Sequence, residues 1–418
     1  MVAGAGARRA ARLNAAIGAR IVRAVFANLA SDLRAMPRPL WMLFAGTFVN
    51  KFGSFVMPFL VLHLTKHGHS PAKAGLAVGA YGVGHLAASA LGGWLADRIG
   101  RRTTIALSMF TGAAAMLALS QAETFSTITA LTLLLGAASE LYRPACSALV
   151  TDLAPPEKRV TAFAVYRLAI NAGFACGPAT AGFLAEKLFI WLFIGDAITS
   201  ALFGVIALAT LPDGERQRGD KADWRADLKQ VARDREFLCF LLAVAPITFV
   251  FFQMTASLPL HVRDVGLSSA AYGVLISLNG LIVVICELPL TSVTQRLPAR
   301  PVMALGYLLT GLGYALTAFA RDAWTLAGTV LVWTLGEMLA SPVSLAYVAG
   351  LAPLHMRGRY LGMVSVVWAL GLIAGPTWGT ALYAHDAPQL WALCAGLGVA
   401  SALCVWVGPE RRQVEQVP

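Results

Sequence analysis

Seven ionisable side chains lie inside stretches of the sequence that are otherwise apolar. They are Lys51, Glu140, Arg143, Arg167, Asp196, Glu287 and Glu337. Charges in apolar surroundings are costly, and they persist chiefly where they pair with one another or line a wet pathway. A purely structural role is the alternative for Asp196 and Glu287, and Arg167 lies close enough to the end of its stretch to reach the membrane surface.

Four of these residues are our candidates for proton coupling: Glu337, Glu140, Lys51 and Arg143. Desolvation disfavours the charged form of a carboxyl group and a neighbouring cation favours it, so a change of surroundings can load and release a proton. Glu140 and Arg143 are three residues apart and would share one face of a helix. The alternative is a permanent structural ion pair, either Glu140 with Arg143 or Lys51 with Glu337.

The apolar stretches that carry these residues are long enough to cross a membrane. Of 418 residues, 57% are hydrophobic and 13% charged, and the mean hydropathy is +0.67. A helix needs about 20 apolar residues to span the hydrocarbon core, where its backbone groups must bond internally. Twelve such stretches occur, at 39–64, 72–96, 104–121, 126–150, 161–185, 188–210, 237–261, 271–295, 301–320, 324–349, 359–383 and 389–408. We therefore predict an all-α membrane protein with twelve transmembrane helices.

Basic residues are shared unequally between the two sides of such a membrane protein. If both termini are cytoplasmic, 25 Lys and Arg residues lie on the cytoplasmic side and 5 in the outer loops. Cytoplasmic loops carry this excess in known membrane proteins. The net charge of +11 is thus a signal of topology and not of nucleic-acid binding. We predict a multi-pass protein of the cell (inner) membrane with both termini cytoplasmic.

An internal repeat divides the chain into two halves. A shift of 198 residues aligns Pro144 with Pro342 and Gly177 with Gly375 without a gap. Such repeats let one half rock against the other around a central site. The predicted organisation is an N-terminal segment at 1–37, six-helix bundles at 38–210 and 237–408, a cytoplasmic linker at 211–236, and a cytoplasmic tail at 409–418. The two bundles should be pseudo-symmetric.

The segment 1–37 has arginines on one helical face and aliphatic residues on the other. This pattern is typical of an amphipathic helix on the inner membrane surface. An organellar targeting peptide, also rich in arginine and poor in acids, is the alternative.

The most specific local motif follows the second span. It reads Gly93-x-x-x-Asp97-Arg98-x-Gly100-Arg101-Arg102. This resembles the loop signature of the major facilitator superfamily, and the whole of 39–408 fits that family's architecture. The resemblance implies that Asp97 lies near the start of span eleven and that Arg101 pairs with Asp152. These residues would form a cytoplasmic gate, and topology-setting charges are the alternative. The shift of 198 places only a remnant in the second half, at Gln295, Arg296, Pro298 and Arg300.

Spans five and eleven carry matching sets of small residues and prolines: Gly173, Gly177, Pro178 and Gly182, and Gly371, Gly375, Pro376 and Gly379. Small residues four apart let helices approach closely, and proline removes a backbone hydrogen bond. Span five is similar to the antiporter motif of drug exporters in the superfamily, although Ala181 stands where a glycine is usual. Ordinary helix packing is the alternative. Leucines at 133–135 occupy the region where those exporters usually carry an arginine, so their proton-coupling assignment is not transferred.

The resemblance also implies that spans one, four, seven and ten line a central cavity. Six polar residues are candidates for contact with a substrate there: Asn50, Tyr81, Tyr166, Asn171, Gln253 and Asn279. Hydrogen bonding between helices is the alternative for each of them. The six cysteines all fall within spans, and neither they nor His85 indicate a metal site. No phosphate-binding loop or nucleophile elbow occurs, so we predict neither an enzyme nor an ATP-driven pump.

The sequence thus predicts a secondary transporter that exports small amphipathic or hydrophobic molecules in exchange for protons. It resembles the bacterial twelve-span drug/proton antiporters. No cofactor is expected, because the proton gradient supplies the energy. The expected partners are a small-molecule substrate, protons and the lipid bilayer, with no nucleic acid, and the protein should be a monomer. The alternatives are a carrier for one metabolite (a sugar, an organic acid or a peptide) and a non-transporting receptor or membrane enzyme on the same scaffold.

Overall fold

The computed structural model describes residues 33–213, 231–353 and 356–409, and every regular element within these ranges is helical. The predicted surface helix before residue 33, most of the linker and the tail after 409 lie outside the described residues. Eleven helical spans in the described part are long and apolar enough to cross a membrane. The twelfth is the helix over 71–99, if its two pieces, bent by 45°, count as one span. The protein is an all-α membrane protein, as predicted.

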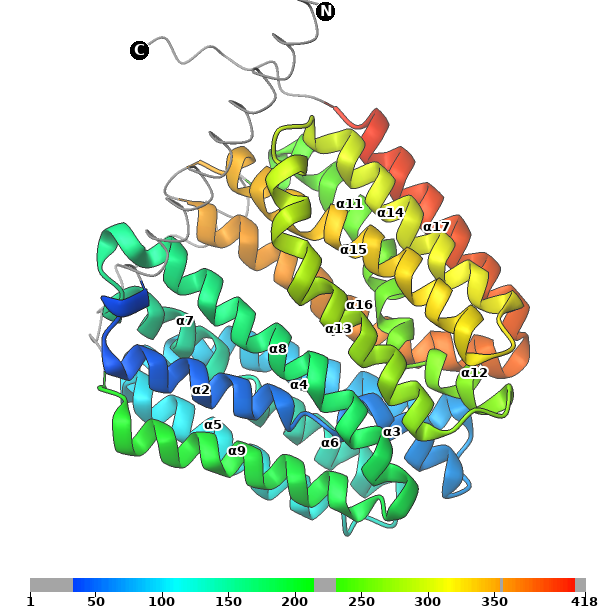
Figure 1. Cartoon of the computed structure of the whole chain (residues 1–418), viewed down its shortest axis with the longest axis horizontal. Coiled ribbons are helices and arrows are strands. Elements are labelled where there is room, and N and C mark those ends of the chain that lie inside the picture. Colours follow the sequence, from blue (N-terminus) through cyan, green and yellow to red (C-terminus); the bar gives the residue numbers. More distant parts are fainter. Residues whose placement is uncertain (1–32, 214–230, 354–355, 410–418) are drawn as a thin grey trace, which may run out of the picture.

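The helices form two bundles, which Figure 1 shows side by side. The N-terminal bundle contains α2 (Arg38–Phe52), α3 (Val56–Lys66), α4 (Pro71–Ile99), α5 (Arg101–Leu119), α6 (Phe125–Ser139), α7 (Tyr142–Leu153), η1 (Pro156–Lys158), α8 (Arg159–Lys187) and α9 (Ile190–Thr210). The C-terminal bundle contains α11 (Arg235–Phe251), η2 (Phe252–Met254), α12 (Leu258–Asp264), α13 (Ser269–Thr294), α14 (Ala299–Leu316), η3 (Thr317–Phe319), α15 (Ala323–Leu351), α16 (Arg357–His385) and α17 (Ala387–Val407).

Three spans are interrupted near their middle. Span one is broken between α2 and α3, span four between α6 and α7, and span seven between α11 and α12. A proline follows each interruption, at Pro58, Pro144 and Pro259. Proline has no N–H and its ring clashes with the carbonyl four residues earlier, so it favours an interruption at that point. In span four this carbonyl belongs to Glu140, which places an acid at the break.

The two ends of the bundles differ in how closely they meet. We call the end with the loops at 67–70, 188–189 and 265–268 the Gly68 end, and the opposite end the Gly100 end. At the Gly68 end, α8 packs on α13 and α4 packs on α16. A Cβ added at Gly75 would lie 2.1 Å from the backbone oxygen of Pro376. Tyr272 donates a hydrogen bond of 3.1 Å to the Pro58 carbonyl across the interface, and Figure 1 shows α3 beside α12 here. The bundles are therefore closed against each other at the Gly68 end.

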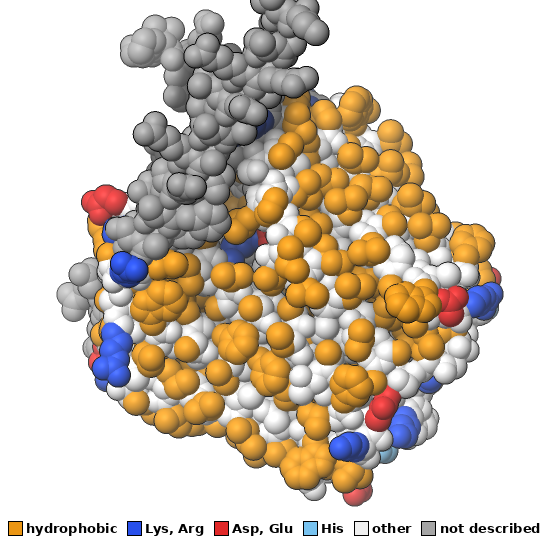
Figure 2. All heavy atoms as spheres, in the orientation of Figure 1, with side chains coloured by type: hydrophobic (Ala, Val, Ile, Leu, Met, Phe, Trp, Pro, Cys, Tyr) orange, Lys and Arg blue, Asp and Glu red, His pale blue; other side chains and the backbone are white. Residues whose placement is uncertain are grey.

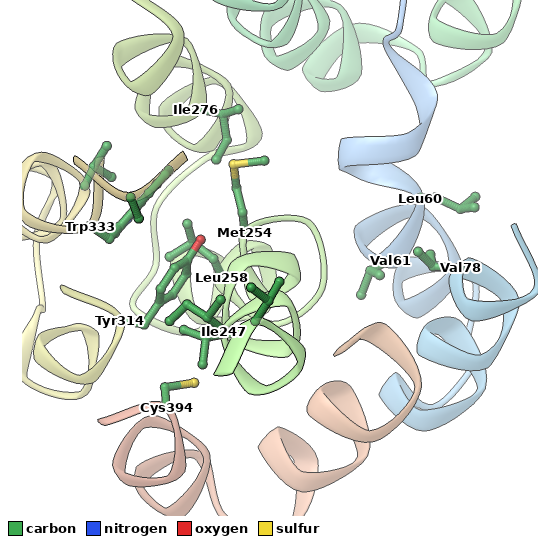
Figure 3. Packing of buried hydrophobic residues seen from close by; sticks show 14 of the residues in the cluster. Leu60, Val61, Val78, Ile247, Met254, Leu258, Ile276, Tyr314, Trp333 and Cys394 are labelled. Carbon is green, nitrogen blue, oxygen red and sulfur yellow. The ribbon is translucent and has the colours of Figure 1, made fainter. Parts of the chain in front are cut away.

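Apolar side chains fill the bundles and also cover their outside. In the C-terminal bundle, Tyr314 and Trp333 stack at 5.3 Å above the buried Leu258 (Figure 3). On the visible face in Figure 2 apolar side chains cover most of the middle, and most of the acids and bases lie near the margins. Side chains as large as Trp378 and Leu288 are about two-thirds exposed. An apolar surface of this extent requires lipid, since soluble proteins keep such patches small.

Candidate functional site

A cavity of about 680 Å³ lies between the two bundles. Five of the seven ionisable residues within the spans line it: Lys51, Glu140, Arg143, Asp196 and Glu337. The first four belong to the N-terminal bundle and Glu337 belongs to the C-terminal bundle. The remaining wall is mostly apolar. Sites of this size, with few polar groups in an apolar lining, are typical for small molecules.

The cavity opens toward the Gly100 end. A Cβ added at Gly93, Gly358 or Gly362 would meet no atom within 4 Å, in contrast to the tight contacts at the other end. The side chain of Arg143, deep within span four, is 50% exposed. It lines the cavity, so its guanidinium is accessible from within the cavity.

Glu140 is surrounded by hydrogen-bond and ion-pair partners. The Nε of Arg143 lies 2.9 Å from its Oε2, and the Tyr81 hydroxyl donates to its Oε1 at 3.0 Å. The Nδ1 of His85 lies 3.5 Å from Oε2. The carboxylate therefore joins span two to both sides of the break in span four. The structural ion pair that we considered as the alternative for Glu140 is present.

Glu337 has a different environment. Its Oε2 accepts a hydrogen bond of 2.9 Å from the amide of Asn279 on α13, and the same amide donates to Thr334 at 3.1 Å. Among the described residues no basic side chain forms an ion pair with Glu337. The alternative pair with Lys51 is not formed, because the Lys51 ammonium lies instead over the ring of Tyr142, 5.6 Å from its centre.

Glu337 also reaches a second cavity of about 160 Å³ inside the C-terminal bundle. Phe251 and Trp368, whose rings pack edge to face at 5.1 Å, line both this pocket and the main cavity. The pocket is thus an apolar extension of the main cavity, with a carboxylate and two aromatic rings at the junction.

Four of the six predicted substrate-contact residues line the main cavity: Asn50, Tyr81, Asn171 and Asn279. The other two do not. Tyr166 is buried in the core of the N-terminal bundle. Gln253 is fully buried, and it donates to the Gly375 carbonyl at 3.2 Å and accepts from the Ser257 hydroxyl at 2.8 Å. These two residues hold helices together within their own bundles.

The remaining two ionisable residues connect the bundles to each other. Arg167 on α8 donates to Glu287 on α13 at 2.5 Å. The sequence suggested that Arg167 extends to the membrane surface and did not reveal this partner, because a pairing between different halves leaves no trace in local spacing.

Only some residues of the loop signature after span two form bonds with other helices. Arg101 forms an ion pair with Asp152 and donates to the Ala148 carbonyl at 3.1 Å. Gly100 has a φ of 93°, which favours glycine because other residues are strained there. Asp97 is exposed, and among the described residues no bond joins it to α16. Since α4 and α16 separate toward the Gly100 end, the contact that the resemblance implies is absent in this open conformation. The role as a gate remains a prediction.

Sequence reasoning missed three bonds of this region. Arg102 pairs with Asp213 just after span six, with Nε 3.1 Å from Oδ1. Arg300, which we treated as part of a remnant, donates to the Gly408 carbonyl just after span twelve at 2.6 Å and pairs with Glu236 at 2.9 Å. The shift of 198 residues relates Arg102 to Arg300. Each arginine therefore ties the end of the last span of its bundle to the start of the third span of that bundle, α5 or α14.

The small residues of spans five and eleven pack in equivalent ways. A Cβ at Gly173 or Gly177 would lie within 2.8 Å of span one, and a Cβ at Gly371 or Gly375 within 2.8 Å of span seven. Gly379 lies against Gln253 of span seven, and Gly182 lies against Ser269 of the other bundle. These sites thus bring span five against span one and span eleven against span seven.

The sequence matches the family model described as Major Facilitator Superfamily over residues 43–285 and 256–418. The chain belongs to the major facilitator superfamily. It is 24% identical to the "Na(+), Li(+), K(+)/H(+) antiporter" of Planococcus maritimus, over 79% of this chain and 85% of that protein. It is 25% identical to "Multidrug resistance protein MdtH" of Cronobacter sakazakii (strain ATCC BAA-894), over 81% and 86%. A solved structure of the nucleoside transporter NupG superposes with a TM-score of 0.77, at 16% identity over 88% of this chain and 99% of that one.

Membership explains the two bundles and the central cavity, and it identifies a multi-pass transporter family and not an enzyme. Within the described residues, no three His, Cys, Asp or Glu side chains gather where they could hold a metal ion. The side chains that line this major facilitator's cavity offer groups for ion pairing and hydrogen bonding.

Proposed function

We propose that this major facilitator exports small amphipathic or hydrophobic molecules in exchange for protons, by alternating access. The observation that carries the proposal is the position of Glu337. It is a carboxylate in the cavity whose bonded partner is the neutral amide of Asn279. Such an acid can gain or lose a proton without leaving a buried cation unpaired, which is the costly outcome for a broken ion pair.

Glu140 is less suited to exchanging protons in this conformation. Protonating it would leave the guanidinium of Arg143, 2.9 Å away, without its counter-charge. We assign Glu140 and Arg143 the task of holding the break in span four. Lys51, which forms no ion pair among the described residues, then serves as the cation of the wall opposite Glu337. When the bundles close on this side, Lys51 approaches Glu337 and favours release of its proton.

The apolar extension supports a hydrophobic substrate. Phe251 and Trp368 offer ring faces at the junction of both cavities, and aromatic side chains bury large apolar areas. Two relatives are named as a multidrug resistance protein and as a cation/proton antiporter. The first name refers to resistance against several drugs and the second to exchange of cations for protons, and both support an exporter.

The loading side follows from the basic residues. We place the Gly100 end on the cytoplasmic side of the cell membrane, because the loops rich in lysine and arginine lie at that end. The cavity of this structure then faces the cytoplasm, the side from which an exporter takes up its cargo. One chain provides both bundles and so encloses the whole cavity, which supports function as a monomer.

A carrier for a single polar metabolite is the second candidate. It is favoured by the N-terminal wall, which gives the cavity four ionisable groups that a purely apolar cargo would not use: Lys51, Glu140, Arg143 and Asp196. A metabolite carrier would saturate with one chemical series. An exporter would protect cells against several unrelated compounds, and that protection would vanish when an uncoupler collapses the proton gradient.

The decisive experiment replaces Glu337 with Gln in protein reconstituted in vesicles. Flux driven by a pH gradient should fall to the level of empty vesicles, whereas exchange of labelled for unlabelled substrate should continue, because the cavity keeps its shape. Glu140→Gln is the matched control, since it removes a carboxylate from the same cavity and should reduce thermal stability. Gradient-driven flux that survives Glu337→Gln would falsify the proposal.

A further inference from the structure

Asp196 lies at the break in span one, although it belongs to span six. Its side chain is 8% exposed and lines the main cavity. The Oδ2 atom accepts a hydrogen bond of 3.4 Å from the backbone N–H of Val56, the first residue of α3. Phe55, at the N-cap position of α3, provides no side-chain cap. The carboxylate of a different helix therefore supplies the acceptor at the start of this half-helix.

The C-terminal bundle shows that such a break does not require an acid. The shift of 198 residues superposes the bounds of α9 on those of α17 to within three residues, and it places Cys394 opposite Asp196. Span seven is nevertheless interrupted. Its break is held by neutral groups, with the Ser257 hydroxyl bonded to Gln253 at 2.8 Å. A structural role alone therefore does not account for an ionisable group at position 196.

Asp196 also lacks a fixed counter-ion. Among the described residues no lysine or arginine forms an ion pair with it, and Lys51 of α2 lines the same cavity. The other ionisable groups on this side are Glu140 with Arg143 at the break in span four, and His63 on α3. The neighbouring helix α5 carries ionisable side chains only at its first two residues, at the Gly100 end.

We propose that Asp196 is a second proton-binding site of the cavity, and that its protonation controls the break in span one. The inference rests on the proposed proton-coupled function. Addition of a proton to the carboxylate gives a neutral carboxyl group and turns one of its oxygens from an acceptor into a donor. The start of α3 then loses a charged acceptor, which a helix N-terminus favours. The half-helix α3 becomes free to shift against α2 and Lys51.

The geometry gives this site a role distinct from that of Glu337. Glu337 faces the cavity from the C-terminal bundle, whereas Asp196 faces it from the N-terminal bundle beside the closed Gly68 end. The break in span one lies against Thr199, which is on the same helix as Asp196. A Cβ added at Gly53 would lie 1.7 Å from the Thr199 hydroxyl oxygen. A change at Asp196 is therefore transmitted to span one by direct contact.

The test measures protonation without any substrate. Infrared difference spectra of the purified protein in lipid are recorded as the pH is lowered, and the carbonyl band of protonated carboxyl groups is followed. Asp196→Asn should remove part of this band, and Glu337→Gln should remove a separate part. Asp322→Asn is the matched control. Asp322 also caps a helix start, with bonds of 2.9 and 3.0 Å to the N–H groups of Trp324 and Thr325, but it lies in an exposed loop.

Transport supplies the second readout. Asp196→Asn should flatten the pH dependence of gradient-driven flux while substrate exchange continues, and Asp196→Glu, which keeps the acid, should shift the titration instead of removing it. An infrared band of wild-type size and titration in Asp196→Asn would overturn the inference. Because the spectra need no substrate, loss of the band at Asp196 together with normal flux in Glu337→Gln would refute the proposed coupling residue and leave this site standing. An unchanged band in Asp196→Asn, together with loss of gradient-driven flux in Glu337→Gln, would refute the Asp196 site and leave the proposed coupling residue standing.

Discussion

Closure of the Gly68 end depends on how closely the bundles approach, and one glycine tests it. Gly273 on α13 lies against α8 of the other bundle. A Cβ added there would lie 2.2 Å from the backbone oxygen of Pro178 and 3.1 Å from the Cα of Gly182. Both neighbours are backbone atoms and cannot turn aside. We predict that Gly273→Ala destabilises this conformation and favours one that is open at the Gly68 end.

The magnitude follows from the geometry. Ordinary contact begins at 3.4 Å, so α8 and α13 must part by about 1 Å to admit the methyl group. Overpacking of a tight interface costs about 1–3 kcal/mol. If the conformation open at the Gly68 end does not contain this contact, the whole cost falls on the closed conformation. The free-energy difference between the two conformations then changes by the same amount. The ratio of the two states then changes by about 5- to 150-fold.

Spin-label distances across the Gly68 end measure this ratio. Thr65 on α3 and Arg263 on α12 are joined across the bundles by a hydrogen bond of 3.1 Å. Both would be replaced with labelled cysteines in a protein whose six native cysteines have been substituted. Gly273→Ala should enlarge the population with long distances. Gly328→Ala is the matched control, because a Cβ at Gly328, near the same end of α15, meets no atom within 4 Å.

The reasoning fails if Gly273→Ala leaves the distance distribution unchanged in a protein that is still folded and monodisperse. Close packing of α8 on α13 would then not be what holds the Gly68 end shut. A shift of equal size in Gly328→Ala would also refute it, because the effect would then arise from the loss of a glycine and not from the contact.

Three ion pairs allow further predictions. Asp152→Asn breaks the buried ion pair between Arg101 and Asp152 and should cost about 3–5 kcal/mol, measured as thermal stability in detergent. Asp213→Asn, at a pair where the acid is 44% exposed, should cost less than about 1 kcal/mol; similar losses in the two variants would contradict the argument from burial. For the pair between the bundles, Arg167→Glu and Glu287→Arg should each slow transport, and the double variant with the charges exchanged should recover most of it. A double variant no better than the single ones would show that the contact does not contribute.

The twelve spans could be predicted from sequence because the hydrocarbon core imposes one rule on every stretch that crosses it. The breaks could not be found in this way, since hydropathy averages over a window and does not register the loss of single backbone bonds. A partial signal was present, because Pro58 and Pro144 each lie inside a predicted span and a proline leaves the carbonyl four residues earlier without its helical donor. Pro178 and Pro376 also lie inside predicted spans, however, and their helices continue through them, so a proline alone does not identify a break.

The cavity was harder to predict than the spans. A helix inside the membrane is apolar toward lipid and toward its neighbours, so periodicity does not show which side faces the pathway. Asn50 and Asn279 line the cavity, whereas Tyr166 and Gln253, equally polar, do not. The bond between Asn279 and Glu337 joins spans eight and ten, and local spacing carries no information about such a partner.

The repeat that supports rocking does not extend to the charges, and the proposed mechanism needs this difference. The shift of 198 residues pairs Lys51 with Phe249, Arg143 with Ser341, Asp196 with Cys394 and Glu337 with Ser139. If both bundles carried the same charges, closing the cavity would bring like charges toward one another, which disfavours ionisation on both walls. With Lys51 and the paired Glu140 and Arg143 on one wall and Glu337 on the other, closing the cavity brings Glu337 toward Lys51, which forms no ion pair among the described residues, and this favours proton release. In the proposed mechanism, duplication provides two bodies that can rock, and the loss of charge symmetry couples their movement to binding and release of a proton.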